Sequence, residues 1–225
     1  MGTILASAIT SKALTILHDS GGVKWTAATE LFGYVNMGQR AVCRLVPSAY
    51  VLSEAVICVS GCKQVLPAGT TLLLSVTRNM GTAETAPGRV PTRVNKKDMD
   101  MSDPSWMTVS ASNPAAAEVI HWLYDLASPM IFYVWPPQPS SAFGYLELER
   151  CAAPADIASH ATVITIGDEW EQALLDAVLH YAYLKDSGHS QFAIQRADQH
   201  LKSFMSSTGV ADKAKAQEAL MQAAG

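Results

Sequence analysis

Residues 169–209, EWEQALLDAVLHYAYLKDSGHSQFAIQRADQHLKSFMSSTG, indicate the structure of the C-terminal third of the chain. Apolar residues recur in it at three- and four-residue steps on both sides of Gly188, which is the pattern of two amphipathic helices. Asp168 and Glu169 lie where acidic residues favour a helix N-terminus. The connection at Gly188 is short, so the two helices are predicted to be antiparallel neighbours. In the second helix, four residues are expected to face inward: Ile194, Ala197, Leu201 and Phe204.

The N-terminal region also has helical periodicity. A first helix is predicted over residues 3–19, and a second is predicted to start at Thr26, a good N-cap residue, and to end before Pro47. Gly33 and Gly38 lie inside the second helix, and each costs a helix about 1 kcal/mol relative to alanine. Their presence predicts that this helix packs tightly against a neighbour.

Between these helical regions, residues 51–153 have the alternation of β-strands, as in EVIHWLYD, MIFYVWP and FGYLELER. Residues 79–118 interrupt the strands with a long stretch rich in Gly, Pro and Thr. The predicted fold class is α+β: a helical bundle of residues 1–50 and 154–209, an inserted antiparallel β-rich region at 51–153 with a long loop, and a C-terminal extension at 210–225.

The extension, VADKAKAQEALMQAAG, is rich in alanine and therefore favours an extended helical tail. Its apolar content is too thin for a core of its own, and an isolated helix of this length is marginal in water. It either frays or lies on another subunit. The candidate contact residues are Val210, Lys213, Lys215, Leu220 and Met221.

A basic cluster lies in the long loop, where Arg89, Arg93, Lys96 and Lys97 are followed at once by acidic residues. Such a cluster is typical of a solvated loop. The alternative is a loop that docks a partner, because long loops in compact proteins are often functional.

The composition excludes several classes of protein. Hydrophobic residues make up 49% of the chain and charged residues 16%, against about 25% charged residues in a typical soluble domain. That balance argues against intrinsic disorder, and the longest apolar runs are far shorter than the ~20 residues of a membrane helix. The net charge of −4 is not that of a nucleic-acid reader, and the N-terminus lacks the basic start of a signal peptide. A surface with so little charge is expected to be covered by other protein.

No catalytic, cofactor-binding or metal-binding motif is present, so no catalytic residue, metal or cofactor is predicted. Cys58 and Cys62 form a C-x3-C pair with strand parity, which indicates two small buried residues on one side of a sheet more than a metal site. An alternative function is a small hydrolase that uses Cys151, or Cys58 and Cys62, with a histidine such as His160. It lacks a recognisable activating pattern.

The order of elements and several motifs resemble the head-to-tail adaptor (connector) proteins of short-tailed bacteriophages, over residues 3–209. The motifs are structural and not catalytic. They are Trp25-Thr26, Asn36 with Gly38-Gln39-Arg40, Phe132-Tyr133-Val134 before Pro136-Pro137, and YAYLKDS in the first of the two final helices.

The resemblance implies a structural protein and not an enzyme. It implies a homo-oligomeric ring, typically a dodecamer, that sits beneath the portal protein and carries the tail nozzle and fibres or spikes. Genomic DNA would pass through its channel without sequence-specific binding, and the protein would be part of the virion, assembled in the bacterial cytoplasm without a membrane. The tail-side loop candidates are Arg89, Arg93, Lys96, Lys97 and Trp106. A tail or neck protein of another stoichiometry is the alternative structural role.

Overall fold

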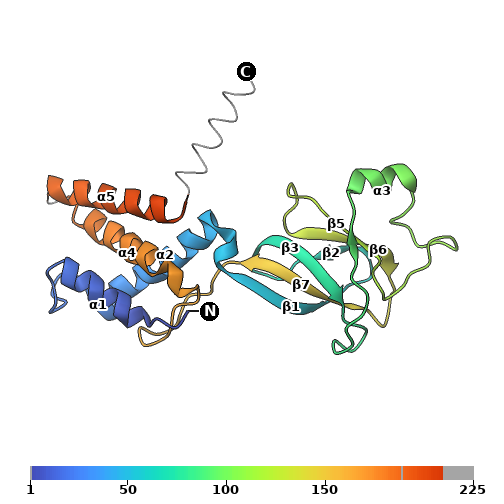
Figure 1. The fold of residues 1–225 in the computed structure, drawn as a ribbon, viewed down its shortest axis with the longest axis horizontal. Coiled ribbons are helices and arrows are strands. Elements are labelled where there is room, and N and C mark those ends of the chain that lie inside the picture. The colour runs from blue at the N-terminus through green and yellow to red at the C-terminus, as the bar shows by residue number, and fades with distance from the viewer. Residues whose placement is uncertain (1, 189, 210–225) are drawn as a thin grey trace, which may run out of the picture. The chain divides into compact units, whose positions relative to one another are not determined.

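The computed structural model describes residues 2–188 and 190–209, and the chain divides into two compact units (Figure 1). The helical unit is formed by Met1–Tyr50 and Ala153–Gly225, and the β unit by Val51–Ala152. The helices and mainly antiparallel sheets of the described residues confirm the α+β class. In the described part of the chain, no helix combines the length and hydrophobicity needed to cross a membrane.

In the part of the helical unit that the structure describes, the α-helices are α1 (Ala6–Ile16), α2 (Phe32–Leu45), α4 (Glu171–Lys185) and α5 (Gln191–Ser207). A π-helical turn at Ala27–Leu31 leads into α2. A 3-10 turn at Pro47–Ala49 follows α2, and another at Asp168–Trp170 precedes α4. α4 packs against α1, α2 and α5 (Figure 1). It is therefore buried on most of its circumference and not along a single stripe.

The stripe predicted for α5 is wrong in two of its four positions. Ala197 and Phe204 are buried, but Ile194 is 44% exposed and Leu201 is 39% exposed. The face toward α4 is completed by Ala193 and by the half-buried His200, which lie at helical spacing from the other two. A polar residue occupies this face because α4 supplies it with a carboxylate partner.

Gly38 confirms the tight packing of α2 that the sequence predicts. A Cβ atom at Gly38 would lie 3.2 Å from both the Ala177 Cβ and a Leu174 methyl carbon of α4. For Gly33 the prediction is wrong, because no described atom lies within 4 Å of the place where its Cβ would be.

The β unit contains two sheets. The first has the strand order β1-β7-β3, with β1 at Val51–Ile57, β7 at Tyr145–Ala152 and β3 at Thr70–Asn79, all antiparallel. Val51, at the start of the unit, pairs with Cys151, near its end.

The second sheet has the order β2-β6-β5-β4: β2 (Gly61–Val65), β6 (Ile131–Gln138), β5 (His121–Tyr124) and β4 (Thr92–Arg93). The two-residue strand β4 pairs with β5 in parallel, whereas the other strand pairs of the unit are antiparallel as predicted. The predicted long loop at 79–118 also contains regular structure, namely β4 and a short helix, α3 (Lys96–Ser102).

The core of the β unit lies between the sheets. Leu73, Val76 and Leu148 of the first sheet cluster with Trp122 and Phe132 of the second. The other face of the second sheet carries a smaller cluster of Cys62, Leu123 and Trp106. Alternate residues of β5 and β6 thus serve two cores, as the two-residue period of a strand requires.

Candidate interaction surfaces

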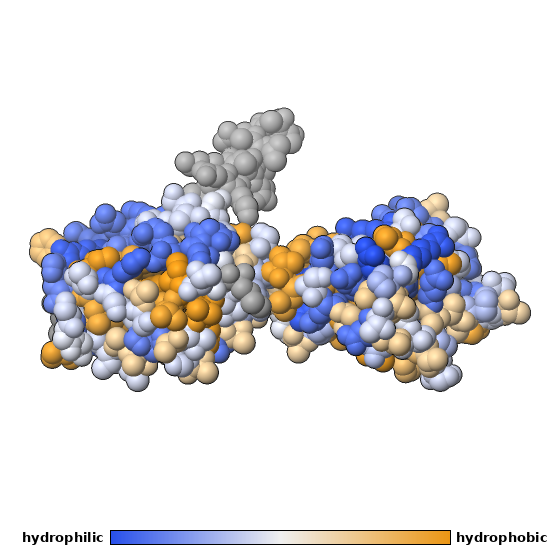
Figure 2. All heavy atoms as spheres, turned by 60° about the horizontal axis from the view of Figure 1, so that its bottom comes forward, coloured by the Kyte–Doolittle hydropathy of each residue, from blue (hydrophilic) through white to orange (hydrophobic). Residues whose placement is uncertain are grey.

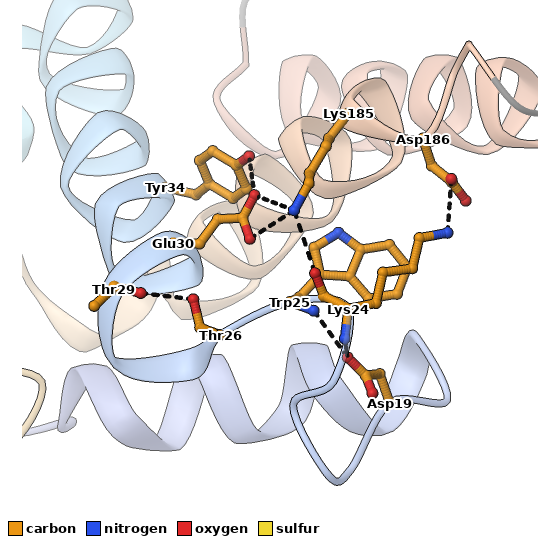
Figure 3. A network of polar contacts seen from close by, with 9 residues as sticks. All are labelled: Asp19, Lys24, Trp25, Thr26, Thr29, Glu30, Tyr34, Lys185 and Asp186. Carbon is orange, nitrogen blue, oxygen red and sulfur yellow. Dashed lines mark hydrogen bonds and ion pairs between the residues drawn. The ribbon is translucent and has the colours of Figure 1, made fainter.

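The connection between α1 and α2 is fastened by one carboxylate (Figure 3). The carboxylate of Asp19 accepts hydrogen bonds from the backbone N–H groups of Val23, Lys24 and Trp25 at 2.8–3.0 Å. These bonds, that from Trp25 foremost, hold the pKa of Asp19 below its ordinary value. The turn places Trp25, 5% exposed, in the core of the helical unit.

A lysine at the end of α4 fastens the same region from the other side (Figure 3). The Nζ atom of Lys185 lies 2.7 Å from a Glu30 carboxylate oxygen and donates to the Lys24 carbonyl oxygen at 3.2 Å. The Tyr34 hydroxyl donates to the same carboxylate, and burial together with the charge of Glu30 raises the pKa of Tyr34. The Lys24 ammonium pairs with Asp186 at 2.6 Å. The charges of this corner are used within the subunit.

Two buried amides on α2 hold the segment that returns from the β unit. Asn36 accepts from the Ile157 N–H at 3.1 Å and donates to its carbonyl oxygen at 3.3 Å. The Gln39 side-chain oxygen accepts from the Thr165 N–H at 2.7 Å. Arg40 forms an ion pair with Asp156 in the same segment. The Asn36 to Arg40 motif is therefore explained by the internal architecture of the helical unit.

A buried carboxylate joins α4 to α5. The two oxygens of Asp176 contact His200 Nδ1 at 2.8 Å and the Ser203 hydroxyl at 2.7 Å, and Gln172 donates to the second oxygen at 3.2 Å. The His200 ring stacks on the Tyr183 ring. Although Ser, His and Asp are present, the serine and the histidine both contact the aspartate. This arrangement does not place a base beside a nucleophile.

The cysteines have the surroundings of core residues. All four are buried. Burial raises the pKa of Cys58 to about 12 and that of Cys62 to about 11, and it raises the pKa of Cys151. The nucleophile of cysteine chemistry is the thiolate, so these shifts disfavour the hydrolase alternative. Cys58 and Cys62 pack into different clusters and not on one side of a sheet, because Cys58 follows the end of β1 whereas Cys62 lies on β2 in the other sheet.

The contacts of His160 and the distribution of potential metal ligands also indicate structural roles. The His160 Nε2 atom is 2.8 Å from the Thr10 hydroxyl, which provides it with a structural partner in the helical unit. Among the described residues, no group of three or more His, Cys, Asp or Glu side chains is arranged to hold a metal ion.

The basic cluster of the long loop is held by aromatic rings. The Arg93 guanidinium lies over the Trp122 ring at 5.2 Å, and the Lys96 ammonium lies over the Tyr133 ring at the same distance. Lys97 is exposed in the first turn of α3, where its N–H donates to the Asn95 side chain at 3.0 Å.

The other two loop candidates are placed differently. Trp106 has no exposed surface, and its indole N–H donates to Asp100 at 2.8 Å, so it supports the loop from inside. Arg89 is exposed, and its carbonyl oxygen accepts from the Asn79 side chain at 2.8 Å. The structure brings Arg93 and Lys96 to the same hollow. The candidates Val210, Lys213, Lys215, Leu220 and Met221 lie outside the described residues.

Hydrophobic side chains reach the surface over both units, as the face drawn in Figure 2 shows. Val23 is 91% exposed and Phe192 75% exposed in the helical unit, and Met101 is 75% exposed and Leu126 68% exposed in the β unit. Exposed apolar side chains that lie together on a surface mark sites of protein contact.

A protein-family model described as SU10 adaptor protein matches the chain. The match covers residues 4–224. The chain belongs to the SU10 adaptor protein family. This family comprises phage head-to-tail adaptors, so the resemblance predicted from the sequence is confirmed. No curated protein matches the chain significantly.

Family membership gives this chain the structural role of a phage adaptor and a place in the virion. The hydrogen bonds and ion pairs of the helical unit therefore stabilise the fold of an adaptor subunit. Sequence reasoning missed the buried Asp176 because no local pattern distinguishes it from the exposed acids of a helix. The one available signal was its spacing from Gln172 and Ala173, on the same side of α4.

Proposed function

We propose that this adaptor assembles into a closed homo-oligomeric ring of twelve subunits that joins the portal to the tail nozzle and fibres or spikes. The ring extends the channel through which the genomic DNA passes. It is assembled in the cytoplasm of the bacterial host. The observation that carries the proposal is the family match over residues 4–224, which leaves almost none of the chain for another role.

The exposed apolar side chains support a ring. In a head-to-tail ring each subunit buries two different faces, and apolar residues such as Val23 and Phe192 then lose their contact with water. Burial of apolar surface is worth about 25 cal/mol per Å² before the costs of association are subtracted. The negative charge of the C-terminal half of the chain suits a channel that must not retain DNA.

The mass and symmetry of the assembled particle test this proposal. Native mass spectrometry of the full chain, alone and with its portal protein, should give a closed ring, and electron micrographs should show twelvefold symmetry. A subunit that stays monomeric even with portal present would overturn it. Another rotational symmetry would favour the alternative, a neck or tail protein of different stoichiometry.

The extension 210–225 is proposed to reach a neighbouring subunit or the portal. Its deletion should weaken ring formation or portal attachment, whereas the thermal unfolding of the remaining chain should be unchanged. Unaltered attachment in the truncated protein would contradict this role. A variant with Lys213 and Lys215 replaced by alanine separates a charge contribution from an apolar one.

A further inference from the structure

Within residues 2–188 and 190–209, no strand pairs with the outer edge of β4 in the second sheet. The N–H groups of Thr92 and Val94 donate to the carbonyl oxygens of Ile120 and Trp122, at the start of β5, at 2.9 and 3.0 Å. Because N–H and C=O groups alternate sides along a strand, those of Arg93 point away from β5. Exposed backbone groups at a sheet edge can pair with another strand.

Two cations flank this edge, one on each face of the sheet. Arg93 lies over Trp122, which belongs to the core between the two sheets. Lys96 lies over Tyr133, which packs against the cluster on the opposite face. The aromatic rings position both positive charges without neutralising them.

The cations of this segment differ from most others in the described chain. Arg89, Arg93, Lys96 and Lys97 have no carboxylate within ion-pair distance in the described residues, whereas cations such as Lys12, Lys24, Arg40, Arg78, Arg150 and Lys185 each have one. The segment 89–97 therefore has positive charge available for a partner.

A hollow of about 630 Å³ lies next to β4 and is lined by Arg93, Asn95, Lys96 and the turn after β5. Leu126 of that turn is 68% exposed and supplies an apolar wall. Asp125 is the acid of the lining, and its carboxylate accepts from the Ala127 N–H at 2.9 Å, which fastens it into the turn. The hollow thus places two cations and an apolar contact next to the β4 edge.

We propose that the β4 edge docks an extended acidic segment of a tail component, which adds to the second sheet as a strand beside Arg93. This inference rests on the proposed function and names the chemistry of its tail-side contact. Backbone hydrogen bonds to Arg93 supply the register, and carboxylates that meet Arg93 and Lys96 supply the preference.

The geometry also sets the spacing of the acidic residues. Arg93 and Lys96 lie on opposite faces of the sheet, and the side chains of an added strand alternate between those faces. The partner's two carboxylates must therefore point to opposite faces of the added strand, as the side chains of adjacent residues do. Two acids separated by one residue would both point to the same face.

The test uses the full-length protein and a labelled synthetic peptide of alternating Thr and Val with an adjacent Glu–Asp pair at its centre. Fluorescence anisotropy should show binding that weakens with salt, and amide hydrogen exchange should slow at Arg93. The double variant Arg93→Glu with Lys96→Glu should weaken binding about tenfold or more. Lys63→Glu, which reverses an exposed charge on the opposite edge strand, should leave binding unchanged.

Three further peptides make the proposal falsifiable. A Lys–Lys version, a version with one residue between the acids, and a version N-methylated at alternate backbone nitrogens should each bind more weakly. Equal binding of the first would overturn the acidic preference, and equal binding of the second or third would overturn strand addition. Absence of binding by the parent peptide would overturn the whole inference and leave a protected sheet edge.

Ring formation of each variant is measured in parallel by native mass spectrometry. If the double variant still forms the ring and the parent peptide does not bind, the proposed function stands and this inference fails. If the peptide binds to a protein that never forms a ring, the proposed ring function fails and strand addition at β4 stands.

Discussion

The helical unit and the segment 89–97 of the β unit use their cations in opposite ways. In the helical unit Lys12, Arg40 and Lys185 pair with carboxylates that lie more than 100 residues away in the sequence. In the segment 89–97, Arg93 and Lys96 lie over aromatic rings instead. One region uses charge to hold distant parts of the chain together, and the other leaves it available.

The difference shows how a chain with few charged residues divides them. An exposed ion pair contributes little to stability, about 0–1 kcal/mol, so the fasteners act mainly through geometry and through the buried polar groups beside them. Substitutions at Asp176 and Asp19 measure how much the carboxylates of the helical unit contribute to its stability.

The largest effect is expected for Asp176→Ala. This change leaves His200 and Ser203 without their acceptor between α4 and α5, so the free energy of unfolding should fall by about 3 kcal/mol. Urea denaturation of the full chain measures it. Asp198→Ala removes an exposed carboxylate of α5 and should change stability by less than about 0.5 kcal/mol. Equal effects of the two changes would show that the buried carboxylate is not a fastener.

Two glycines of α2 form a matched pair. Gly38→Leu should destabilise the protein by about 1–3 kcal/mol, because the side chain would meet Ala177 and Leu174 of α4. Gly33→Ala should stabilise it by about 0.5–1 kcal/mol, because no described neighbour meets the added methyl group and alanine is the better helix former. Thermal denaturation should move the two midpoints in opposite directions. A shift in the same direction would contradict the packing described for α2.

A smaller effect should appear at low pH. Hydrogen bonds from Trp25 and its neighbours lower the pKa of Asp19, and bonds from Thr3 lower that of Asp168. Because these folded-state pKa values lie below the unfolded ones, the stabilisation is present above the unfolded pKa, about 3.9, and is lost as the pH falls through the folded pKa. Asp19→Asn should therefore flatten the loss of stability below pH 4.

Acid-unfolding curves of wild type, Asp19→Asn and Asp168→Asn measure this effect. Asp198→Asn has the same change in net charge and serves as the control. An acid limb that is as steep in Asp19→Asn as in wild type would show that the carboxylate does not couple the α1–α2 connection to pH.

The smallest change concerns the cysteines, which should be silent. The four buried thiols should not react with Ellman's reagent in the folded protein within minutes, and all four should react in denaturant. Rapid labelling of one thiol in the folded protein would show an opened core. It would also reopen the question of cysteine chemistry.

Periodicity was enough to predict the α+β class and the approximate limits of the main helices. It could not predict which face of α5 is buried, because His200 takes an inward position that only the carboxylate of Asp176 makes favourable. A partner on another helix has no signature in the local pattern. For the same reason the sequence revealed the basic cluster at 89–97 but not its aromatic partners.

The tail-side candidates show the same limit in another way. Trp106 follows the basic cluster closely in sequence and is of a residue type common in protein contacts. It is nevertheless fully buried, and its indole N–H donates to Asp100. The free edge of β4 was not predicted, since two residues are too few for an alternating pattern. Strand pairing with a segment about thirty residues away is a tertiary property.

The pairing of Val51 with Cys151 has a consequence for how such a chain can change. Opposite residues of antiparallel strands lie about 5 Å apart, so the β unit leaves and rejoins the helical unit at nearly the same point. A short turn suffices to connect Tyr50 to Ala153, and any module whose two ends are adjacent fits the same gap. The β unit can therefore be replaced by another module without a change in the chain path of the helical unit.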